Sequence, residues 1–315
     1  MGLLGSDGMV RTGAVVVDWH RPDDTLTALN SLRAMVPQPD VLVCVENGCT
    51  TEEVELVRRG APPATKIIEL PENIGFAGAV NLGVAKALDA GADWVLLLNN
   101  DARVEASCLG RLLDESAREP RVAAAGPAIS FADRPERLWF GGGEVSDWFT
   151  FSRHRGLMAS SSDPPPSSDT GYISGCCMLV SAAAWRELGP FRADFFAYYE
   201  DAEWCQRVRA SGWRCRYVGE VLCAHAVSAS SLERGSLSLS ETTAYYKARN
   251  PLRFAIETSA LGRRLTRILG VLVVWNGYHA WRLLQIRQAN VAKAYLRGIA
   301  DAVRGHMGPY GKLAS

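Results

Sequence analysis

The chain has 315 residues, of which 48% are hydrophobic and 22% are charged, and these proportions are typical of a globular protein with a core. The length allows one large domain with an appendage, or two domains. The formal net charge is zero at pH 7, and no nucleic-acid partner is expected. The residues before Thr12 have no charged start followed by a long apolar run, so no signal peptide is expected.

Strands and helices alternate along the N-terminal part of the chain. Buried strands are predicted at Ala14–Trp19, Val41–Val45, Lys66–Leu70 and Trp94–Leu98, and helices at Pro22–Met35, Glu52–Arg59 and Phe76–Leu88. This alternation predicts an α/β fold, with a parallel sheet that carries helices on both faces. Ligands of such sheets bind beyond the carboxyl ends of the strands.

The middle of the chain is less regular. We predict a helix at Ala106–Arg118, a strand at Val122–Ile129, a Ser- and Pro-rich loop at Met158–Thr170, a strand at Tyr172–Val180, a short helix capped by Ser181, a helix at Glu200–Ser211 and a strand at Trp213–Val218. The serine-rich segment Ala226–Ser240 is expected to be mobile. Helical periodicity dominates from Glu241 onward.

Polar clusters follow three of the predicted strands. They are Asp18 with His20, Glu46 with Asn47, and Asn99, Asn100 and Asp101. Because parallel strands end at the same edge of a sheet, we expect these clusters to converge. A carboxylate such as Asp101 can hold a hard divalent cation or cap the next helix. For Asp101 taken alone, the helix cap is the favoured interpretation. Asn99 and Asn100 add oxygen ligands or donors to phosphate.

A second acidic cluster, Glu200, Asp201 and Glu203, follows the aromatic stretch Phe195–Tyr199. Carboxylates at a helix start interact favourably with the helix dipole, which is a sufficient structural explanation. Aromatic neighbours would also raise a carboxylate pKa and favour a general base. His225 is a ligand candidate only in the company of these groups. Together the clusters suggest metal-assisted transfer of a group from a diphosphate leaving group.

The segment Asn73–Gly83 is glycine-rich at a strand-to-helix junction. It has neither G-x-G-x-x-G nor the lysine and serine of a P-loop, so neither dinucleotide nor ATP binding is predicted. Close helix packing also explains Gly75 and Gly78.

Charge is distributed unevenly. Residues 242–315 carry twelve Lys or Arg and two Asp or Glu, a charge of +10, and residues 1–241 carry −10. This asymmetry suggests an anionic partner, such as a phospholipid surface or a diphosphate-bearing acceptor. Solvated faces of amphipathic helices explain it equally well. The uncharged run Ile268–Trp281 predicts a buried helix or, as an alternative, a helix lying in a membrane interface.

Four segments occur in an order and spacing that are specific only when taken together. They are Glu46-Asn47-Gly48, Asn73–Gly83, Leu98–Asp101 and Phe191–Trp213. In them the sequence resembles the family 2 glycosyltransferases, especially the bacterial rhamnosyltransferase-like branch. The likeness runs from about Ala14 to Ser230, with a weaker part at Tyr245–Leu252. It implies a GT-A fold with a Rossmann-like, mostly parallel sheet and a C-terminal helical extension.

The resemblance also implies residue roles and chemistry. Asp201 matches the general base, Asp101 the metal-binding Asp of the family's D-x-D-like motif, and His225 a second ligand to Mg²⁺ or Mn²⁺. Glu200 and Glu203 are expected to orient the acceptor. The residues expected to bind the nucleotide sugar are Asp18, His20, Glu46, Asn47, Asn73, Gly75, Asn81, Asn99 and Asn100. Glu46 departs from the family, which usually has an Asp that reads the nucleobase.

These roles imply an inverting transferase that moves a deoxyhexose such as rhamnose from a dTDP- or UDP-sugar. The expected acceptor is a glycan, a lipid-linked precursor or a small secondary metabolite. A catalytic domain is expected over residues 1–240, with a nucleotide-sugar half at about 14–130 and an acceptor half at about 131–240, and a basic helical extension over 241–315. The expected location is the cytoplasm, with peripheral contact at the inner face of an anionic membrane.

Two other functions are compatible with a parallel sheet and acidic clusters. One is a nucleotidyltransferase that makes sugar nucleotides, but the basic glycine-rich loop that such enzymes need soon after the first strand is missing from the sequence. The other is a non-catalytic partner protein in which the carboxylates serve only as helix caps. Donor hydrolysis, or metal-dependent nucleotide binding, would separate an enzyme from such a partner.

Overall fold

One mixed sheet of ten strands organises residues 12–225. The computed structural model describes residues 10–145, 152–226, 240–258, 261–275, 277 and 288–311. The ten strands are β1 (Thr12–Asp18), β2 (Val41–Asn47), β3 (Lys66–Leu70), β4 (Trp94–Asn99), β5 (Ala102–Val104), β6 (Val122–Phe131), β7 (Leu138–Phe140), β10 (Ser168–Asp169), β11 (Cys177–Ser181) and β12 (Arg214–His225). A separate hairpin pairs β8 (Gly143–Val145) with β9 (Ser152–His154).

The sheet order is β10-β12-β6-β11-β4-β1-β2-β3, with β5 beside β12 and β7 beside β6. Strands β1 to β4 pair in parallel, as the alternation of strands and helices predicts. Strand β11 runs antiparallel between β4 and β6, so the sheet as a whole is mixed. Strands β6 and β12 also pair in parallel. The α/β class with a mostly parallel sheet is therefore confirmed, and β11 supplies antiparallel pairs at its centre.

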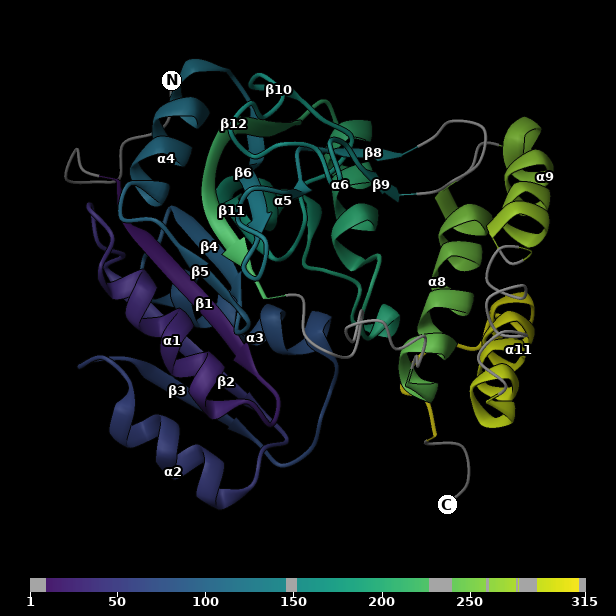
Figure 1. Cartoon of the computed structure of the whole chain (residues 1–315), viewed down its shortest axis with the longest axis horizontal. Coiled ribbons are helices and arrows are strands. Elements are labelled where there is room, and N and C mark those ends of the chain that lie inside the picture. The colour runs from purple at the N-terminus through teal and green to yellow at the C-terminus, as the bar shows by residue number, and fades with distance from the viewer. Residues whose placement is uncertain are drawn as a thin grey trace.

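Helices α1 to α4 connect the strands of this first half (Figure 1). The helices and helical turns are α1 (Pro22–Arg33), α2 (Thr51–Gly60), α3 (Phe76–Asp89), α4 (Cys108–Arg118), α5 (Ala182–Leu188), η1 (Ala193–Phe195), α6 (Glu200–Ala210), α8 (Glu241–Thr258), α9 (Leu261–Gly270), η2 (Val271–Trp275) and α11 (Ala289–Arg304). Local sequence explains several starts. Pro22 opens α1, Thr50 and Glu53 form a capping box on α2, and the Ser181 hydroxyl accepts the Ala184 N–H at the start of α5.

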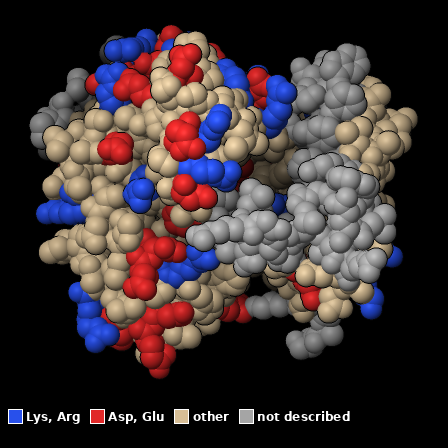
Figure 2. All heavy atoms as spheres, in the orientation of Figure 1, with Lys and Arg blue, Asp and Glu red and all other residues tan. Residues whose placement is uncertain are grey.

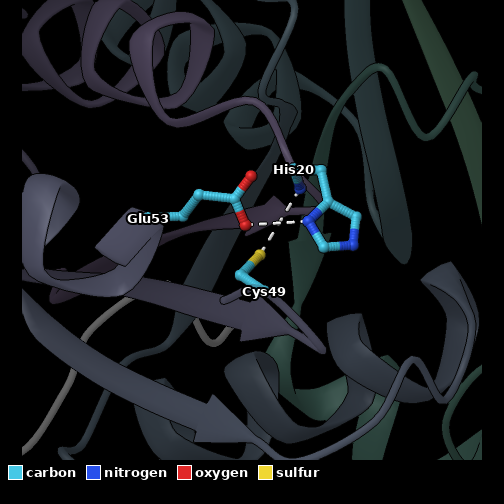
Figure 3. A group of neighbouring side chains, drawn as sticks. All are labelled: His20, Cys49 and Glu53. Carbon is cyan, nitrogen blue, oxygen red and sulfur yellow. Dashed lines mark hydrogen bonds and ion pairs between the residues drawn. The ribbon is translucent and has the colours of Figure 1, made fainter. Parts of the chain in front are cut away.

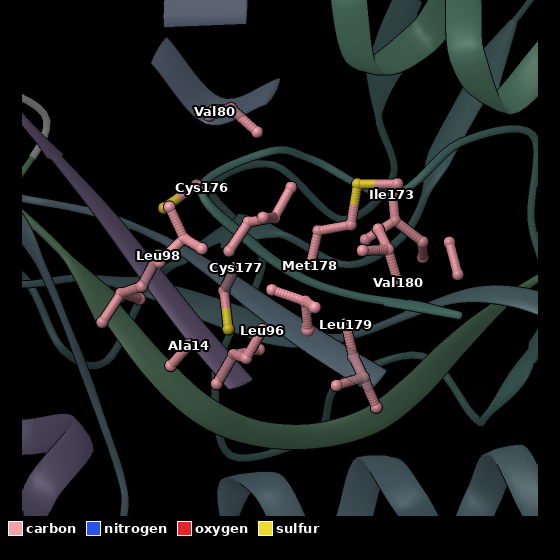
Figure 4. Close-up of a cluster of buried hydrophobic side chains, with 14 of the residues drawn as sticks. Ala14, Val80, Leu96, Leu98, Ile173, Cys176, Cys177, Met178, Leu179 and Val180 are labelled. Carbon is pink, nitrogen blue, oxygen red and sulfur yellow. The ribbon is translucent and has the colours of Figure 1, made fainter. Parts of the chain in front are cut away.

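The core lies where β4 and β11 meet. Figure 4 shows Leu96 and Leu98 of β4 close to Cys177 and Leu179 of β11, with Ile173 nearby, and all five side chains are buried. Because helices cover the strands, apolar residues occupy both faces of β4, and the strand has no alternation of apolar and polar residues. This packing fixes the carboxyl end of β4, where Asn99 is the last residue and Asp101 follows two positions later.

Three predicted elements need correction. The strand predicted at Tyr172–Val180 starts only at Cys177, because the backbone before it bends to place the Gly175 N–H on a side-chain carboxylate. The strand predicted to end at Val218 continues as β12 to His225, across a bulge after Val218. The loop predicted at Met158–Thr170 contains the short strand β10, and β5 and β7 to β9 were not predicted.

The helices α8, α9 and α11 lie beside the α/β body (Figure 1). Helix α8 packs on α11 through Ala244, Ala248, Val291 and Tyr295, and Phe254 of α8 joins the main core. Within the described part of the chain, no helix has the length and apolar character needed to cross a membrane. Residues 227–239 of the predicted serine-rich segment, and most of the uncharged run beyond Trp275, lie outside the described residues.

Candidate active site at the carboxyl ends of the strands

Asp18 and Glu46 form a buried carboxylate pair at one edge of the sheet. They are register partners at the ends of β1 and β2. The Asn100 amide donates to Asp18 Oδ1 at 3.2 Å, whereas Asp18 Oδ2 and Glu46 Oε2 are buried without a hydrogen-bond partner. Burial, and then the Asp18 charge, raise the pKa of Glu46 to about 7, and burial also raises the pKa of Asp18. Burial thus favours the protonated form of both carboxyls.

His20, Cys49 and Glu53 lie next to this pair (Figure 3). His20 Nδ1 is 2.8 Å from Glu53 Oε2, and the His20 N–H donates to Cys49 Sγ at 3.4 Å. Glu53 Oε2 also accepts the Thr50 N–H at 2.8 Å and so completes the cap of α2. These contacts give the Glu53 carboxylate a structural role as part of the helix cap, so no ligand is needed to explain its position. Burial raises the pKa of the Cys49 thiol to about 12, so the thiol stays protonated.

Asn47 organises the glycine-rich segment. Its side chain donates to Asn73 Oδ1 at 3.0 Å and accepts the Ile74 N–H at 2.9 Å, and Asn73 Oδ1 also accepts the Gly75 N–H at 2.8 Å. Asn81 lies further along α3, where its amide exchanges two hydrogen bonds with the backbone of Phe191. Asn47 and Asn73 thus shape the edge of the site, whereas Asn81 ties α3 to the segment before η1.

Asp101 and His225 meet beyond the carboxyl end of β4. Because β12 pairs antiparallel with β5, His225 lies opposite Ala102, and its Nε2 is 3.0 Å from Asp101 Oδ1. The two side chains are only 7% and 9% exposed, and the Trp139 ring lies edge-on to the imidazole at 4.4 Å. His225 Nδ1 is buried without a hydrogen-bond partner. A carboxylate and an imidazole this close are a donor set that fits a divalent cation such as Mn²⁺.

Asp201 is held at the start of α6. Its Oδ2 accepts the Gly175 N–H at 2.9 Å, and its Oδ1 accepts the Ala202 N–H at 2.7 Å. Burial raises the pKa of Asp201, and burial followed by the Asp201 charge raises the pKa of Glu200 well above its ordinary value. Glu203 instead pairs with Arg207 at 2.9 Å, which gives its carboxylate a structural partner. Its predicted role toward an acceptor stays a prediction.

The loop before Asp201 has an unusual backbone. Phe196, Tyr198 and Tyr199 have φ values of 68°, 70° and 74°. Bulky side chains rarely adopt this region, and each such residue costs about 1–3 kcal/mol. Strain of this kind concentrates at functional sites, so the loop makes the start of α6 a candidate functional position.

Backbone contacts connect the two acidic clusters. The Asn99 N–H at the end of β4 donates to the Cys176 carbonyl at 2.9 Å, and the neighbouring Gly175 holds Asp201. The pKa of the Cys176 thiol is raised first by burial and further by the charges of both Asp101 and Asp201. Asp201 and Asn99, which lies two residues before Asp101, therefore contact the neighbouring residues Gly175 and Cys176.

Several residues of this site had no predicted role. Gly175 lies in the predicted strand Tyr172–Val180, and nothing in the sequence marks its N–H as a partner for Asp201. His154 is partly exposed, its pKa is lowered to about 4 by desolvation, and its ring is 4.4 Å from Trp139. The sequence around His154 is polar, and a single histidine in such a stretch does not predict a place beside Trp139.

Comparisons with known proteins identify relatives of the chain. A family model described as "Glycosyl transferase family group 2" matches residues 94–299. An N-acetylglucosaminyl-diphospho-decaprenol L-rhamnosyltransferase of Mycobacterium tuberculosis is 29% identical over an alignment of 216 residues that covers 60% of this chain and 67% of the relative. The galactofuranosyltransferase GlfT1 of the same organism is 36% identical over 128 residues, 40% of this chain and 42% of that protein.

A similar solved structure is the mannosyltransferase PcManGT from Pyrobaculum calidifontis, in complex with GDP-Man and Mn²⁺. The TM-score is 0.54 at 19% sequence identity, and the match covers 96% of this chain and 76% of that chain. At this level of identity the likeness concerns the fold.

Proposed function

Because this glycosyltransferase belongs to glycosyl transferase family group 2 and has the GT-A fold, we propose that it is an inverting, metal-dependent enzyme that moves a deoxyhexose from a nucleotide-diphosphate donor. The acceptor group is a hydroxyl. One observation carries the proposal: Asp201 accepts the Gly175 N–H, and the adjacent Cys176 carbonyl accepts the N–H of Asn99, two residues before the Asp101 that meets His225. The residues that would hold the metal ion on the diphosphate and the residue that would accept the proton would then face the same sugar.

The donor would bind across the carboxyl ends of β1, β2 and β4. Asp18, Glu46 and Asn47 would hold the nucleoside, and the unpartnered oxygens of Asp18 and Glu46 support this, because a buried polar atom without a partner is costly unless a ligand satisfies it. Asp101 and His225 would hold Mg²⁺ or Mn²⁺. When bound, the ion would neutralise charge on the diphosphate leaving group.

Asp201 would act as the general base. Burial raises the pKa of Asp201, which makes its carboxylate a stronger base, and its two backbone hydrogen bonds fix the carboxylate. In this role Asp201 takes the proton of the acceptor hydroxyl. The hydroxyl oxygen then bonds to the anomeric carbon as the bond to the diphosphate breaks. Attack opposite the leaving group inverts the anomeric configuration.

Rhamnose is the proposed sugar. The longer of the two matches is to an L-rhamnosyltransferase, and the shorter one is to a galactofuranosyltransferase. A donor screen with purified protein tests this by measuring nucleotide release from dTDP-rhamnose, UDP-hexoses and a nucleotide-activated galactofuranose. Each donor is assayed with Mn²⁺, Mg²⁺ and EDTA. Release only from dTDP-rhamnose with metal supports the proposal, and preference for another donor overturns this choice of sugar.

The proposed acceptor is a sugar on a polyprenyl diphosphate, because the name of the rhamnosyltransferase relative specifies such an acceptor. Six large apolar side chains on the C-terminal helices are 49–68% exposed: Leu265, Leu269, Val273, Val274, Leu296 and Val303. With the positive charge of residues 242–315, they would suit an anionic membrane surface.

Liposome flotation tests the membrane contact. We expect flotation to require anionic lipid, to weaken with salt and to fall in the double variant Leu265→Glu with Leu269→Glu. Leu157→Glu is the matched control, because Leu157 is also half exposed but lies on the α/β body. Equal flotation with neutral lipid would remove the membrane from the proposal.

A further inference from the structure

Two fully buried polar residues of α8, Arg249 and Asn250, contact the strained loop that precedes Asp201. They lie about fifty positions after that loop in the sequence. The proposed reaction uses neither side chain directly. A buried guanidinium and a buried amide are costly unless their hydrogen bonds are made, so the partners of these two groups indicate what they do.

Asn250 binds three carbonyls of the loop with one amide group. Its Nδ2 donates to the carbonyls of Phe195 at 3.1 Å, Ala197 at 2.7 Å and Tyr198 at 2.8 Å. Three of the four backbone carbonyls of Phe195–Tyr198 therefore contact this one amide group. The Asn250 Nδ2 group therefore binds only backbone atoms of the loop and fixes the path of its backbone.

Arg249 supports the same contact. Its Nε donates to Asn250 Oδ1 at 2.8 Å, which orients the amide so that Nδ2 faces the loop. Its Nη2 donates to the carbonyls of Phe195 at 2.8 Å and Asp194 at 3.1 Å, and its Nη1 donates to the Gly308 carbonyl at 2.6 Å. The guanidinium thus joins the loop, the amide and the C-terminal segment after α11.

The loop adopts a conformation that needs such support. The Ala197 N–H donates to the Phe195 carbonyl at 2.9 Å, and Phe196 has φ 68° and ψ −63°, which defines a classic γ-turn. Tyr198 and Tyr199 follow with φ values of 70° and 74°. A segment with three such residues persists only when its surroundings over-determine it.

The opposite side of the loop rests on the donor side of the site. The Phe196 carbonyl accepts the Ala77 N–H of α3 at 3.2 Å, and the Phe196 ring stacks on Tyr246 of α8 at 5.1 Å. Gly75 lies so close that a Cβ there would be 2.6 Å from the Phe196 carbonyl oxygen. The loop is therefore gripped between α3 and α8.

From these contacts we infer that Arg249 and Asn250 are positioning residues for glycosyl transfer. They hold the γ-turn and the two left-handed tyrosines, and so set the direction in which α6 presents Asp201. Helix α6 begins at Glu200, immediately after Tyr199, so a relaxed loop reorients its first turn. The inference rests on the proposed role of Asp201 as the base.

Steady-state kinetics of Asn250→Asp and Asn250→Ala test the inference on the full chain. Asp keeps the size of the side chain but removes the N–H donors. We expect kcat to fall by about 10–100-fold with the KM for the donor changed less than about twofold, because a small displacement of a reacting group has an effect of this size. The acidic limb of the kcat/KM profile against pH should also move, because the surroundings of Asp201 change. Asn290→Ala, at an exposed position of α11, is the matched control.

A purely structural role predicts a different result. In that case the melting temperature falls, but kcat per folded molecule and the acidic limb stay as in the parent, and the inference is overturned. If both variants at Asn250 fail to fold, Arg249→Lys keeps the positive charge and removes the contact with the amide, and the same two readouts apply. Turnover that survives in Asp201→Asn sinks the proposed base instead, whatever the variants at Asn250 do.

Discussion

The two acidic clusters of this protein are positioned by different means. Asp101 follows a buried strand directly, and the register of β5 with β12 brings His225 to it. Asp201 follows a strained aromatic loop and depends on a glycine N–H and on side chains from α8. A carboxylate at a strand end thus takes its position from the sheet, whereas one at a helix start needs distant partners.

The largest effect is expected at Asp201, the carboxylate that the aromatic loop supports. We expect Asp201→Asn to lower kcat by about 10²–10⁴-fold, because the amide cannot accept the acceptor proton. Donor affinity, measured by calorimetry, should stay near that of the parent. Glu187→Gln is the control, since Glu187 is a half-exposed carboxylate that pairs with Arg121. Turnover close to the parent value would refute the assignment of the base.

The proposed metal-ligand role of Asp101, the carboxylate that the sheet positions, is tested by Asp101→Ala. We expect kcat/KM to fall on the order of 10²-fold, since loss of a ligand weakens neutralisation of the diphosphate. Added Mn²⁺ should recover part of the loss, and EDTA should abolish activity in the parent. The affinity for Mn²⁺ in the presence of nucleotide gives an independent readout. Unchanged metal affinity and unchanged activity would argue against a cation at Asp101.

A third variant sharpens the comparison at the contact between the loop and α3. Gly75 has φ +85°, and a Cβ there would lie 2.6 Å from the Phe196 carbonyl oxygen. We expect Gly75→Ala to lower the free energy of unfolding by about 2–3 kcal/mol and to reduce activity as well. Gly91→Ala separates the two causes, because Gly91 has φ +88° and its nearest contact is at 3.7 Å. That control should cost about 1 kcal/mol and leave activity unchanged.

The smallest effect concerns Glu46 and depends on pH. Its pKa is about 7 in the folded state against an ordinary 4.5, so the folded state retains a proton that the unfolded chain releases in this interval. The free energy of unfolding should therefore fall as the pH rises from 4.5 to 7. Glu46→Gln imitates the protonated form, and we expect it to be more stable than the parent by about 1–2 kcal/mol at pH 8.

Chemical denaturation across this pH range measures the difference between Glu46→Gln and the parent. The gain should shrink toward zero near pH 4.5, and Glu136→Gln in an exposed loop should show no such trend. A gain that is constant with pH would mean that the proton on Glu46 is not its cause.

The amino-acid sequence by itself determined the α/β class, the first four strands and the polar residues that follow them. These predictions succeed because apolar β-branched runs form buried strands, and parallel strands end at one edge whatever the details of packing. It is this rule that places Asp18, Glu46 and Asn100 together before any coordinates are known.

Only the tertiary structure decided the rest of the site. The reversal of β11, the extension of β12 to His225, the N–H of Gly175 and the partners Arg249 and Asn250 all depend on contacts between segments far apart in the chain. A local pattern records the propensity of a segment for helix or strand, but it does not record which distant carbonyl a buried amide will satisfy. That choice is made by packing, because most buried polar groups of a folded protein must have a hydrogen-bond partner.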